Sequence, residues 1–201
     1  MTVPAHARAV IIGGGVVGCS VAYHLGKLGW RDVVLLERKQ LTSGTTWHAA
    51  GLIAQLRATQ NMTRLAKYSQ ELYFSLEAET GVATGFKRNG SITVALTDER
   101  MEELRRSAAM ARAFGVEIEE ISPAEIGARY PGLLVDDAFG GVWLPKDGQA
   151  DPVNITQALA KGARNNDVAI HQGVKVIGIT QTDGCVTGVK TDAGNIAADY
   201  V

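Results

Sequence analysis

The alternation of apolar and polar positions predicts a strand, a helix and a second strand at the start of the chain. A β-branched run, Ala9–Ile12, ends in glycines, and a continuous apolar run, Val33–Leu36, is typical of a strand buried in a parallel sheet. Between them, apolar side chains recur at helical spacing up to Gly29, at Val21, Ala22, Leu25 and Leu28. The segment therefore predicts a βαβ unit.

Helical periodicity returns in the middle of the chain. Residues 62–80 carry apolar side chains at steps of three and four, which predicts an amphipathic helix whose apolar face carries Leu65, Tyr68, Leu72 and Leu76. A strand is predicted over Ser91–Leu96, after the Asn89–Gly90 turn. The next predicted helix exposes Glu102 and Arg106 as an ion pair. Its other face carries Met101, Leu104, Ala108 and Ala111.

Capping residues mark two further helix starts. Ser122–Glu125 has the form of a capping box with proline at the first helical position, and Tyr130–Gly132 ends that helix. Asp151 and Pro152 open another helix in the same way. The predicted buried face of that helix carries Ile155, Ala158, Leu159 and Gly162.

The C-terminal part of the chain has a different, β-like pattern. Residues 174–181, 185–190 and 195–201 are separated by the turn pairs Asp183–Gly184 and Ala193–Gly194. They predict a small antiparallel meander that feeds one more strand. Because the chain ends on β-like residues without a turn, a cap or a polar tail, we expect it to be the N-terminal fragment of a longer protein.

Composition and charge narrow the class of protein. The 201 residues are 46% hydrophobic, and 20 basic against 21 acidic residues give a formal net charge of −1. The chain therefore predicts a globular fold without the basic surplus that nucleic-acid binding requires. Cys19 and Cys185 show no metal-ligand spacing and favour a reducing compartment. We interpret both as buried thiols, and expect a cytoplasmic protein with no metal site.

The N-terminal apolar stretch has an alternative interpretation. Arg8 followed by Ala9–Ala22 could be a short signal peptide, in which Val16–Cys19 resembles a lipoprotein cleavage box. Its glycines, and a length below the roughly 20 residues that span a bilayer, favour a strand and a turn instead. No other run reaches membrane length, so we predict no membrane insertion.

Three glycines, Gly13, Gly15 and Gly18, form the pattern GxGxxG where the first strand passes into the helix. The first permits a sharp turn, the second lets backbone approach a pyrophosphate, and the third lets helix and strand pack closely. Glu37 ends the second strand about 20 residues later, where a carboxylate accepts ribose hydroxyls and disfavours a 2′-phosphate. The combination predicts a dinucleotide site, and the alternative is a glycine-rich turn beside a surface glutamate.

The segment after the second strand favours FAD over NAD. Ser43, Gly44, Thr45 and Thr46 offer amides and hydroxyls that can hold a second phosphate and a ribityl chain. An NAD domain would normally continue with further βα units, whereas here a β-meander appears later in the chain. We therefore predict FAD as the cofactor.

The same segment resembles a known family. Residues 41–52, Gly90–Ile92 and Asp147–Pro152 are similar to the dimethylglycine and sarcosine dehydrogenases, within the D-amino-acid-oxidase-like FAD oxidoreductases. The resemblance covers nearly the whole chain. It implies an α/β fold, with a GxGxxG-type, Rossmann-like FAD-binding domain of parallel sheet and β-meander. An inserted α+β substrate domain is expected to be only partly present.

The resemblance also implies roles for single residues. In that family the histidine at the position of His48 is bonded through a ring nitrogen to the methyl group on the benzenoid ring of the flavin, and backbone at the position of Val176 meets the adenine. Arg38 joins Glu37 among the predicted cofactor-binding residues. A packed loop histidine beside a noncovalent flavin, and an ordinary alternating strand at Val176, are the alternatives. Trp47 either lines the flavin site or only packs.

The expected domains follow from this resemblance. Residues 1–85 would form the first part of the FAD-binding domain, residues 86–149 the first part of the substrate domain, and residues 150–201 the truncated continuation of the FAD-binding domain. The fragment alone is then expected to hold FAD poorly and to be inactive. No catalytic acid or base is predicted within it.

The implied activity is oxidative demethylation of an N-methylated glycine-type amine, dimethylglycine or sarcosine, by hydride transfer to the flavin. The resulting iminium would hydrolyse to formaldehyde, or give its one-carbon unit to tetrahydrofolate in a C-terminal domain outside this sequence. Dioxygen or an electron-transfer flavoprotein would accept the electrons. Two alternatives stay open: a related FAD enzyme acting on another amine or a hydroxy acid, and a regulatory flavin-domain homologue without turnover.

Overall fold

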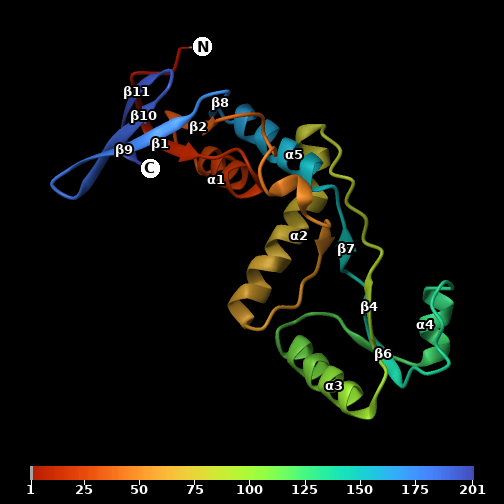
Figure 1. Cartoon of the computed structure of the whole chain (residues 1–201). Coiled ribbons are helices and arrows are strands. Elements are labelled where there is room, and N and C mark those ends of the chain that lie inside the picture. Colours follow the sequence, from red (N-terminus) through yellow and green to blue (C-terminus); the bar gives the residue numbers. More distant parts are fainter. Residues whose placement is uncertain (1) are drawn as a thin grey trace. The chain divides into compact units, whose positions relative to one another are not determined.

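The structure, a computed structural model, describes residues 2–201, which form two compact units (Figure 1). Unit 1 comprises the chain up to Gly51, Tyr73–Gly85 and Asp151–Val201, and unit 2 comprises Leu52–Leu72 and Phe86–Ala150. The units differ from the predicted domain boundaries chiefly in residues 52–72. That segment belongs to unit 2, where its strand β3 (Leu52–Ile53) pairs antiparallel with β7 (Gly148–Gln149).

Unit 1 is built on a six-stranded sheet with the order β8-β2-β1-β11-β10-β9. Its strands are β1 (His6–Ile12), β2 (Val33–Glu37), β8 (Ala169–Gln172), β9 (Val176–Thr182), β10 (Cys185–Thr191) and β11 (Gly194–Tyr200). The first four strands in the sheet order run parallel, and β10 and β9 continue it antiparallel. The predicted βαβ unit and antiparallel meander are confirmed, whereas β8 was not predicted.

Two helices of unit 1, α1 (Val16–Lys27) and α5 (Pro152–Asn165), pack against each other beside the parallel strands. Residues 33–36 of β2 are buried, as expected for a strand inside a parallel sheet. The meander shares a hydrophobic core with β1 and β2, and no residue of this core is helical. The core consists of Ala7, Val10, Val34, Leu36, Val174, Val189, Ile196 and Ala198. The predicted α/β class, a parallel sheet with a β-meander, is confirmed.

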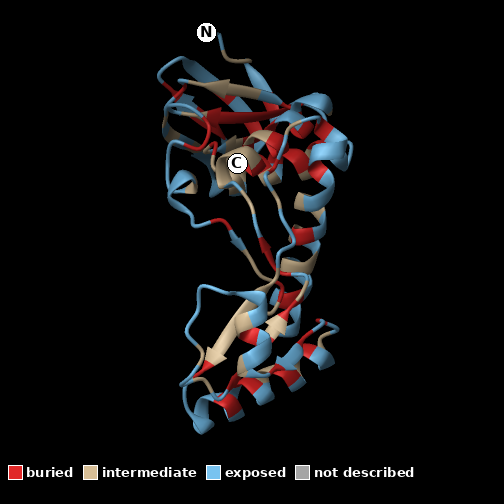
Figure 2. Ribbon diagram, turned by 90° about the vertical axis from the view of Figure 1, so that its right-hand side faces the viewer, coloured by how far each residue is buried: buried red, intermediate tan, exposed pale blue. Residues whose placement is uncertain are grey.

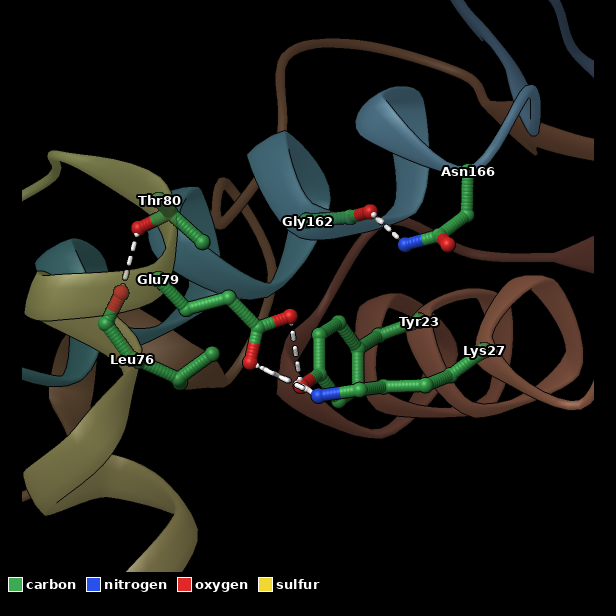
Figure 3. Close-up of polar contacts among 7 residues, drawn as sticks. All are labelled: Tyr23, Lys27, Leu76, Glu79, Thr80, Gly162 and Asn166. Carbon is green, nitrogen blue, oxygen red and sulfur yellow. Dashed lines mark hydrogen bonds and ion pairs between the residues drawn. The ribbon is translucent and has the colours of Figure 1, made fainter.

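A polar cluster around the buried Tyr23 joins α1 to the end of α2 (Gln60–Thr80), as Figure 3 shows. The hydroxyl of Tyr23 donates to the Glu79 carboxylate at 2.8 Å, and Lys27 Nζ donates to the Tyr23 hydroxyl and to Glu79, both at 2.7 Å. Burial raises the pKa of Tyr23, so its phenol keeps its proton. Burial also favours a raised pKa for Glu79, but the hydrogen bonds from Lys27 and Tyr23 outweigh it and lower that pKa. The phenol therefore donates to an ionised carboxylate, which is a strong type of hydrogen bond.

Unit 2 contains a three-stranded sheet with the order β4-β6-β5. Its elements are β4 (Ser91–Ala95), α3 (Asp98–Ala113), β5 (Glu119–Ile121), α4 (Pro123–Arg129) and β6 (Gly140–Leu144). The predicted face of α3 is buried, and buried positions recur along this helix in Figure 2. The Glu102–Arg106 ion pair, at 3.4 Å, and the capping box of Ser122 and Glu125 are also confirmed.

The helix predicted over residues 62–80 is confirmed as α2, and its predicted apolar face is confirmed at Leu76, which is fully buried, but is wrong in the first half of the helix. Leu65 and Tyr68 are 57% and 52% exposed, whereas Gln70 is fully buried. The buried amide is tolerated because Gln70 Nε2 donates to the Lys146 carbonyl at 2.6 Å and Gln70 Oε1 accepts from Gln55. Neither α2 nor any other helix within residues 2–201 is long and apolar enough to cross a membrane.

Candidate functional site

The turn between β1 and α1 has backbone geometry that only glycine tolerates. Gly13 lies at φ +108°, and its N–H donates to the Leu36 carbonyl on the neighbouring strand at 2.8 Å. A Cβ atom added at Gly18 would lie 1.9 Å from the Gly13 carbonyl oxygen. The first and third glycines of the pattern therefore hold the helix close against the turn.

The N-terminus of α1 opens toward this turn. Gly15 precedes the helix without a side-chain cap, and the first helical bond runs from the Cys19 N–H to the Gly15 carbonyl at 3.0 Å. The amides before Cys19 therefore lack partners inside the helix, and that of Val16 donates to Thr46 Oγ1 at 3.0 Å. We call Gly13–Val16 the phosphate cradle. Because the amides of Gly13, Gly14 and Val16 donate to Leu36, Glu37 and Thr46, the turn offers an anion the Gly15 amide and the helix N-terminus that follows it.

Glu37, at the end of β2, has a fixed carboxylate. One oxygen accepts from the Gly14 N–H at 2.7 Å, and the other accepts from the Lys39 N–H at 2.8 Å. These bonds hold the carboxylate next to the phosphate cradle. An acidic group in this position can accept ribose hydroxyls while the adjoining amides hold phosphate.

A pocket of about 280 Å³ lies beside Glu37, and we call it the adenosine pocket. It is lined by Ile12, Gly13, Leu36, Glu37, Arg38, Val174, Lys175 and Val176. Four predicted site residues, Gly13, Glu37, Arg38 and Val176, thus meet around one cavity. Ligand pockets usually measure about 300–1,000 Å³, so the cavity suits the adenosine part of a dinucleotide. With the glycine turn and the cradle beside it, the site fits the nucleotide half of FAD.

The remaining predicted residues lie on Thr42–His48, which we call the flavin segment. Thr42 begins it in a left-handed conformation, φ +71°, and its N–H donates to the Gly14 carbonyl at 2.9 Å. After Thr42 the segment runs outside the adenosine pocket, with Ser43, Gly44 and Thr45 exposed. Thr46 reaches back to the phosphate cradle through its bond to Val16.

His48 closes the short helix η1 (Thr46–His48) with its side chain exposed. Its ring lies 3.8 Å from the Trp47 ring, centroid to centroid, at 36°. Within residues 2–201 no group hydrogen-bonds the His48 imidazole. Both ring nitrogens are therefore accessible to a ligand, unlike those of His24, whose Nδ1 lies 2.7 Å from the Ser20 carbonyl.

Sequence reasoning missed two residues next to this site. Lys175 lines the adenosine pocket, and Gln172 Oε1 accepts from the Leu41 N–H at 2.7 Å. Gln172 ends β8 and Lys175 follows it, and β8 pairs with β2 so that Gln172 lies opposite Glu37. Recognising β8 as the parallel neighbour of β2 would have placed both residues at the same sheet edge as Glu37.

The two cysteines differ in a way that the sequence did not predict. Cys19 is buried in α1, and burial raises the pKa of its thiol to about 12. Cys185 is exposed, because it occupies the first position of β10 beside the hairpin turn. Its interpretation as a buried thiol is therefore wrong. Among the described residues, no group of His, Cys, Asp or Glu side chains could hold a metal ion.

Comparisons with curated proteins identify relatives of the chain. The chain is 40% identical over 204 residues to the mitochondrial sarcosine dehydrogenase of Homo sapiens, covering 98% of the chain and 22% of that protein. It is also 40% identical over 200 residues to the mitochondrial pyruvate dehydrogenase phosphatase regulatory subunit of Mus musculus, covering 100% of the chain and 23% of that protein. The chain thus spans less than a quarter of the length of these relatives.

Solved structures share the fold. The chain matches L-proline dehydrogenase from P. horikoshii with a TM-score of 0.93 and 29% identity, covering 99% of this chain and 53% of that one. Glycine oxidase from Geobacillus kaustophilus matches with a TM-score of 0.83 and 26% identity, covering 98% and 54%. A family model described as FAD dependent oxidoreductase (DAO) matches residues 8–201. From this match, the chain belongs to the DAO family of FAD-dependent oxidoreductases.

Proposed function

We propose that the protein oxidises an N-methylated glycine-type amine, dimethylglycine or sarcosine, with FAD as hydride acceptor. The observation that carries this proposal is the 40% identity to human sarcosine dehydrogenase over 98% of the chain. Bound FAD supplies the chemistry by accepting hydride from the carbon next to the amine nitrogen. Residues of this chain hold and orient the cofactor.

Each part of the site has a proposed task in holding FAD. Glu37 binds the ribose hydroxyls, and Arg38 and Val176 border the adenine. The Gly15 amide and the N-terminus of α1 bind phosphate, to which Thr46 offers its hydroxyl. Such fixed donors align the cofactor without reorganising when it binds.

We further propose that His48 carries FAD covalently. Support comes from its exposed imidazole, which no group within residues 2–201 engages by hydrogen bonding, because a neutral imidazole with a free nitrogen is a competent nucleophile near pH 7. A ring nitrogen of His48 would bond to the flavin methyl carbon, with loss of two protons and transfer of two electrons to dioxygen. The tether would prevent the cofactor from dissociating.

The remaining steps belong to the same proposal. The iminium product would hydrolyse to formaldehyde or pass its one-carbon unit to tetrahydrofolate, with dioxygen or an electron-transfer flavoprotein as acceptor. We also propose a reducing, cytoplasmic location, which the lack of a disulfide between Cys19 and Cys185 supports. The mitochondrial relatives make a mitochondrial location the competing outcome of a fractionation experiment.

A regulatory role is the second candidate function. It is favoured by the 40% identity to the regulatory subunit of pyruvate dehydrogenase phosphatase, which covers the whole chain. A regulatory homologue would bind flavin without turning over an amine. Anaerobic addition of sarcosine or dimethylglycine separates the two candidates, because only the enzyme would lose its flavin absorbance near 450 nm.

Acid precipitation of the full-length protein tests the covalent bond. We expect yellow flavin to remain with the pellet, and the tryptic peptide from Gln40 to Arg57 to carry the mass of FAD. His48→Ala should release the flavin into the supernatant, whereas His6→Ala, which changes another exposed histidine, should not. Flavin that washes free of the wild type would refute the bond but keep FAD binding, and a protein without flavin would refute the FAD proposal.

A further inference from the structure

Gln172 connects two segments that lie far apart in the sequence. It ends β8 opposite Glu37, and its Oε1 accepts from the Leu41 N–H at 2.7 Å. The backbone beside it continues the contact, because the Gly173 N–H donates to the Lys39 carbonyl at 2.9 Å. The chain leaving β2 is therefore held along the end of β8 up to Leu41.

The bond to Gln172 is made just before the flavin segment begins. Leu41 is buried, and the next residue, Thr42, donates its N–H to the Gly14 carbonyl and takes a left-handed conformation. Two consecutive amides are thus fixed, one by the Gln172 side chain and one by the phosphate cradle. Together they set the direction in which the chain continues to Thr46.

The adenosine pocket does not depend on this bond. Glu37 is oriented by its own bonds to the amides of Gly14 and Lys39, and the Val174 N–H donates to the Glu37 carbonyl at 3.0 Å. None of these contacts involves the Gln172 side chain. Removing the Gln172 amide should therefore disturb the flavin segment and leave the nucleotide pocket in place.

We propose that Gln172 is a positioning residue for the cofactor, which aligns the flavin segment with the phosphate cradle by holding the Leu41 amide. The inference rests on the proposed function, because it assumes that the flavin segment binds the part of FAD beyond adenosine. A buried amide that loses its acceptor is destabilised. The segment should then leave its aligned position, so FAD binding should weaken while the binding of a ligand confined to the adenosine pocket stays nearly unchanged.

The test uses full-length protein in the His48→Ala background, so that bound FAD can dissociate whether or not the wild type is covalently loaded. FAD and AMP are titrated separately against Gln172→Met, which keeps the length of the side chain without its amide oxygen, and against Gln172→Ala. Gln181→Met, at an exposed glutamine of β9, is the matched control. Amide exchange of the peptide from Gln40 to Arg57 reports the segment directly.

We expect both Gln172 variants to weaken FAD binding about tenfold, equivalent to about 1.4 kcal/mol. AMP binding should change less than twofold, and exchange in the Gln40–Arg57 peptide should speed up at least fivefold. Equal weakening of FAD and AMP would indicate a merely structural residue, and unchanged FAD binding would refute the inference. If the parent protein binds AMP but not FAD, or neither ligand, the proposed function fails and the inference with it.

Discussion

The adenosine pocket and the flavin segment are neighbours in the chain but are built by different means. The pocket gathers residues from β1, β2 and the start of β9, and its key carboxylate is fixed by two backbone amides. The flavin segment is anchored at Thr42 and Thr46 and exposes the side chains between them. The adenosine pocket therefore depends on the pairing of strands in the sheet, whereas the position of the flavin segment depends on a few anchoring bonds. Substitutions can separate the two regions.

The largest effect on cofactor binding is expected from a side chain added to the glycine turn, which both the adenosine pocket and the flavin segment contact. Gly18→Val would place a Cβ atom 1.9 Å from the Gly13 carbonyl oxygen and push α1 away from the turn. We expect more than a hundredfold loss of both FAD and AMP binding, and a loss of about 3 kcal/mol or more in the free energy of unfolding. Titration and urea unfolding measure these changes. Gly132→Ala, in unit 2, is a comparison in open space, and an equal effect there would contradict the geometric explanation.

Glu37→Gln changes the adenosine pocket and should weaken the binding of both FAD and AMP. The substitution keeps the shape but removes the charge that strengthens hydrogen bonds to ribose and to the Gly14 amide. Bonds to charged groups contribute about 1.5–3 kcal/mol, so we expect FAD and AMP to bind roughly 10- to 100-fold more weakly. Calorimetric titration of both ligands measures this. Glu77→Gln, at an exposed position of α2, is the control, and AMP binding that survives Glu37→Gln would place the ribose elsewhere.

Thr46→Val changes the flavin segment and should weaken FAD binding more than AMP binding. The variant keeps the branched shape and removes the oxygen that accepts from the Val16 N–H. One neutral hydrogen bond contributes about 1 kcal/mol, which predicts about fivefold weaker FAD binding with little change for AMP. Parallel titrations in the His48→Ala background measure the ratio. Should AMP weaken as much as FAD, Thr46 would belong to the nucleotide pocket.

The smallest effect should come from the Tyr23 cluster, which touches neither region. Glu79 has a lowered pKa in the folded protein, so its stabilising contribution is present above the unfolded value of about 4.3 and is lost as pH falls through the lowered value. Glu79→Gln should therefore lower the free energy of unfolding by about 0.5–1 kcal/mol at pH 7 and by progressively less below pH 4. Urea unfolding between pH 3 and pH 8 measures the difference. A gap that stays constant down to pH 3 would exclude this linkage, and altered FAD affinity would show that stability alone affects the cofactor site.

Local chemistry made much of the fold predictable. Ser122 and Glu125 form a capping box because the partners lie in one turn of helix, and the glycine pattern at Gly13 and Gly18 shapes one tight turn. The meander is likewise marked by its own turns. In each case the interacting groups are close in sequence, so the pattern alone contains the information.

Long-range contacts explain what the sequence did not reveal. The short, partly polar stretch Ala169–Gln172 is a strand because it pairs with β2, and the role of Gln172 depends on that pairing. Gln70 is buried instead of the apolar side chains of Leu65 and Tyr68, because its partners come from distant segments of unit 2. The spacing of apolar residues predicts which face of a helix is apolar. It does not predict which distant segment will bury a polar side chain.

The buried thiol in α1 has a consequence for a protein that would use dioxygen. Two-electron reduction of dioxygen yields hydrogen peroxide, which attacks cysteines through their thiolate form. Burial raises the pKa of the Cys19 thiol to about 12, so the thiolate form is scarce at pH 7. The Cys19 thiol, which donates to the Gly14 carbonyl of the phosphate cradle at 3.7 Å, would therefore be protected from this by-product, and α1 would resist oxidative damage at that position.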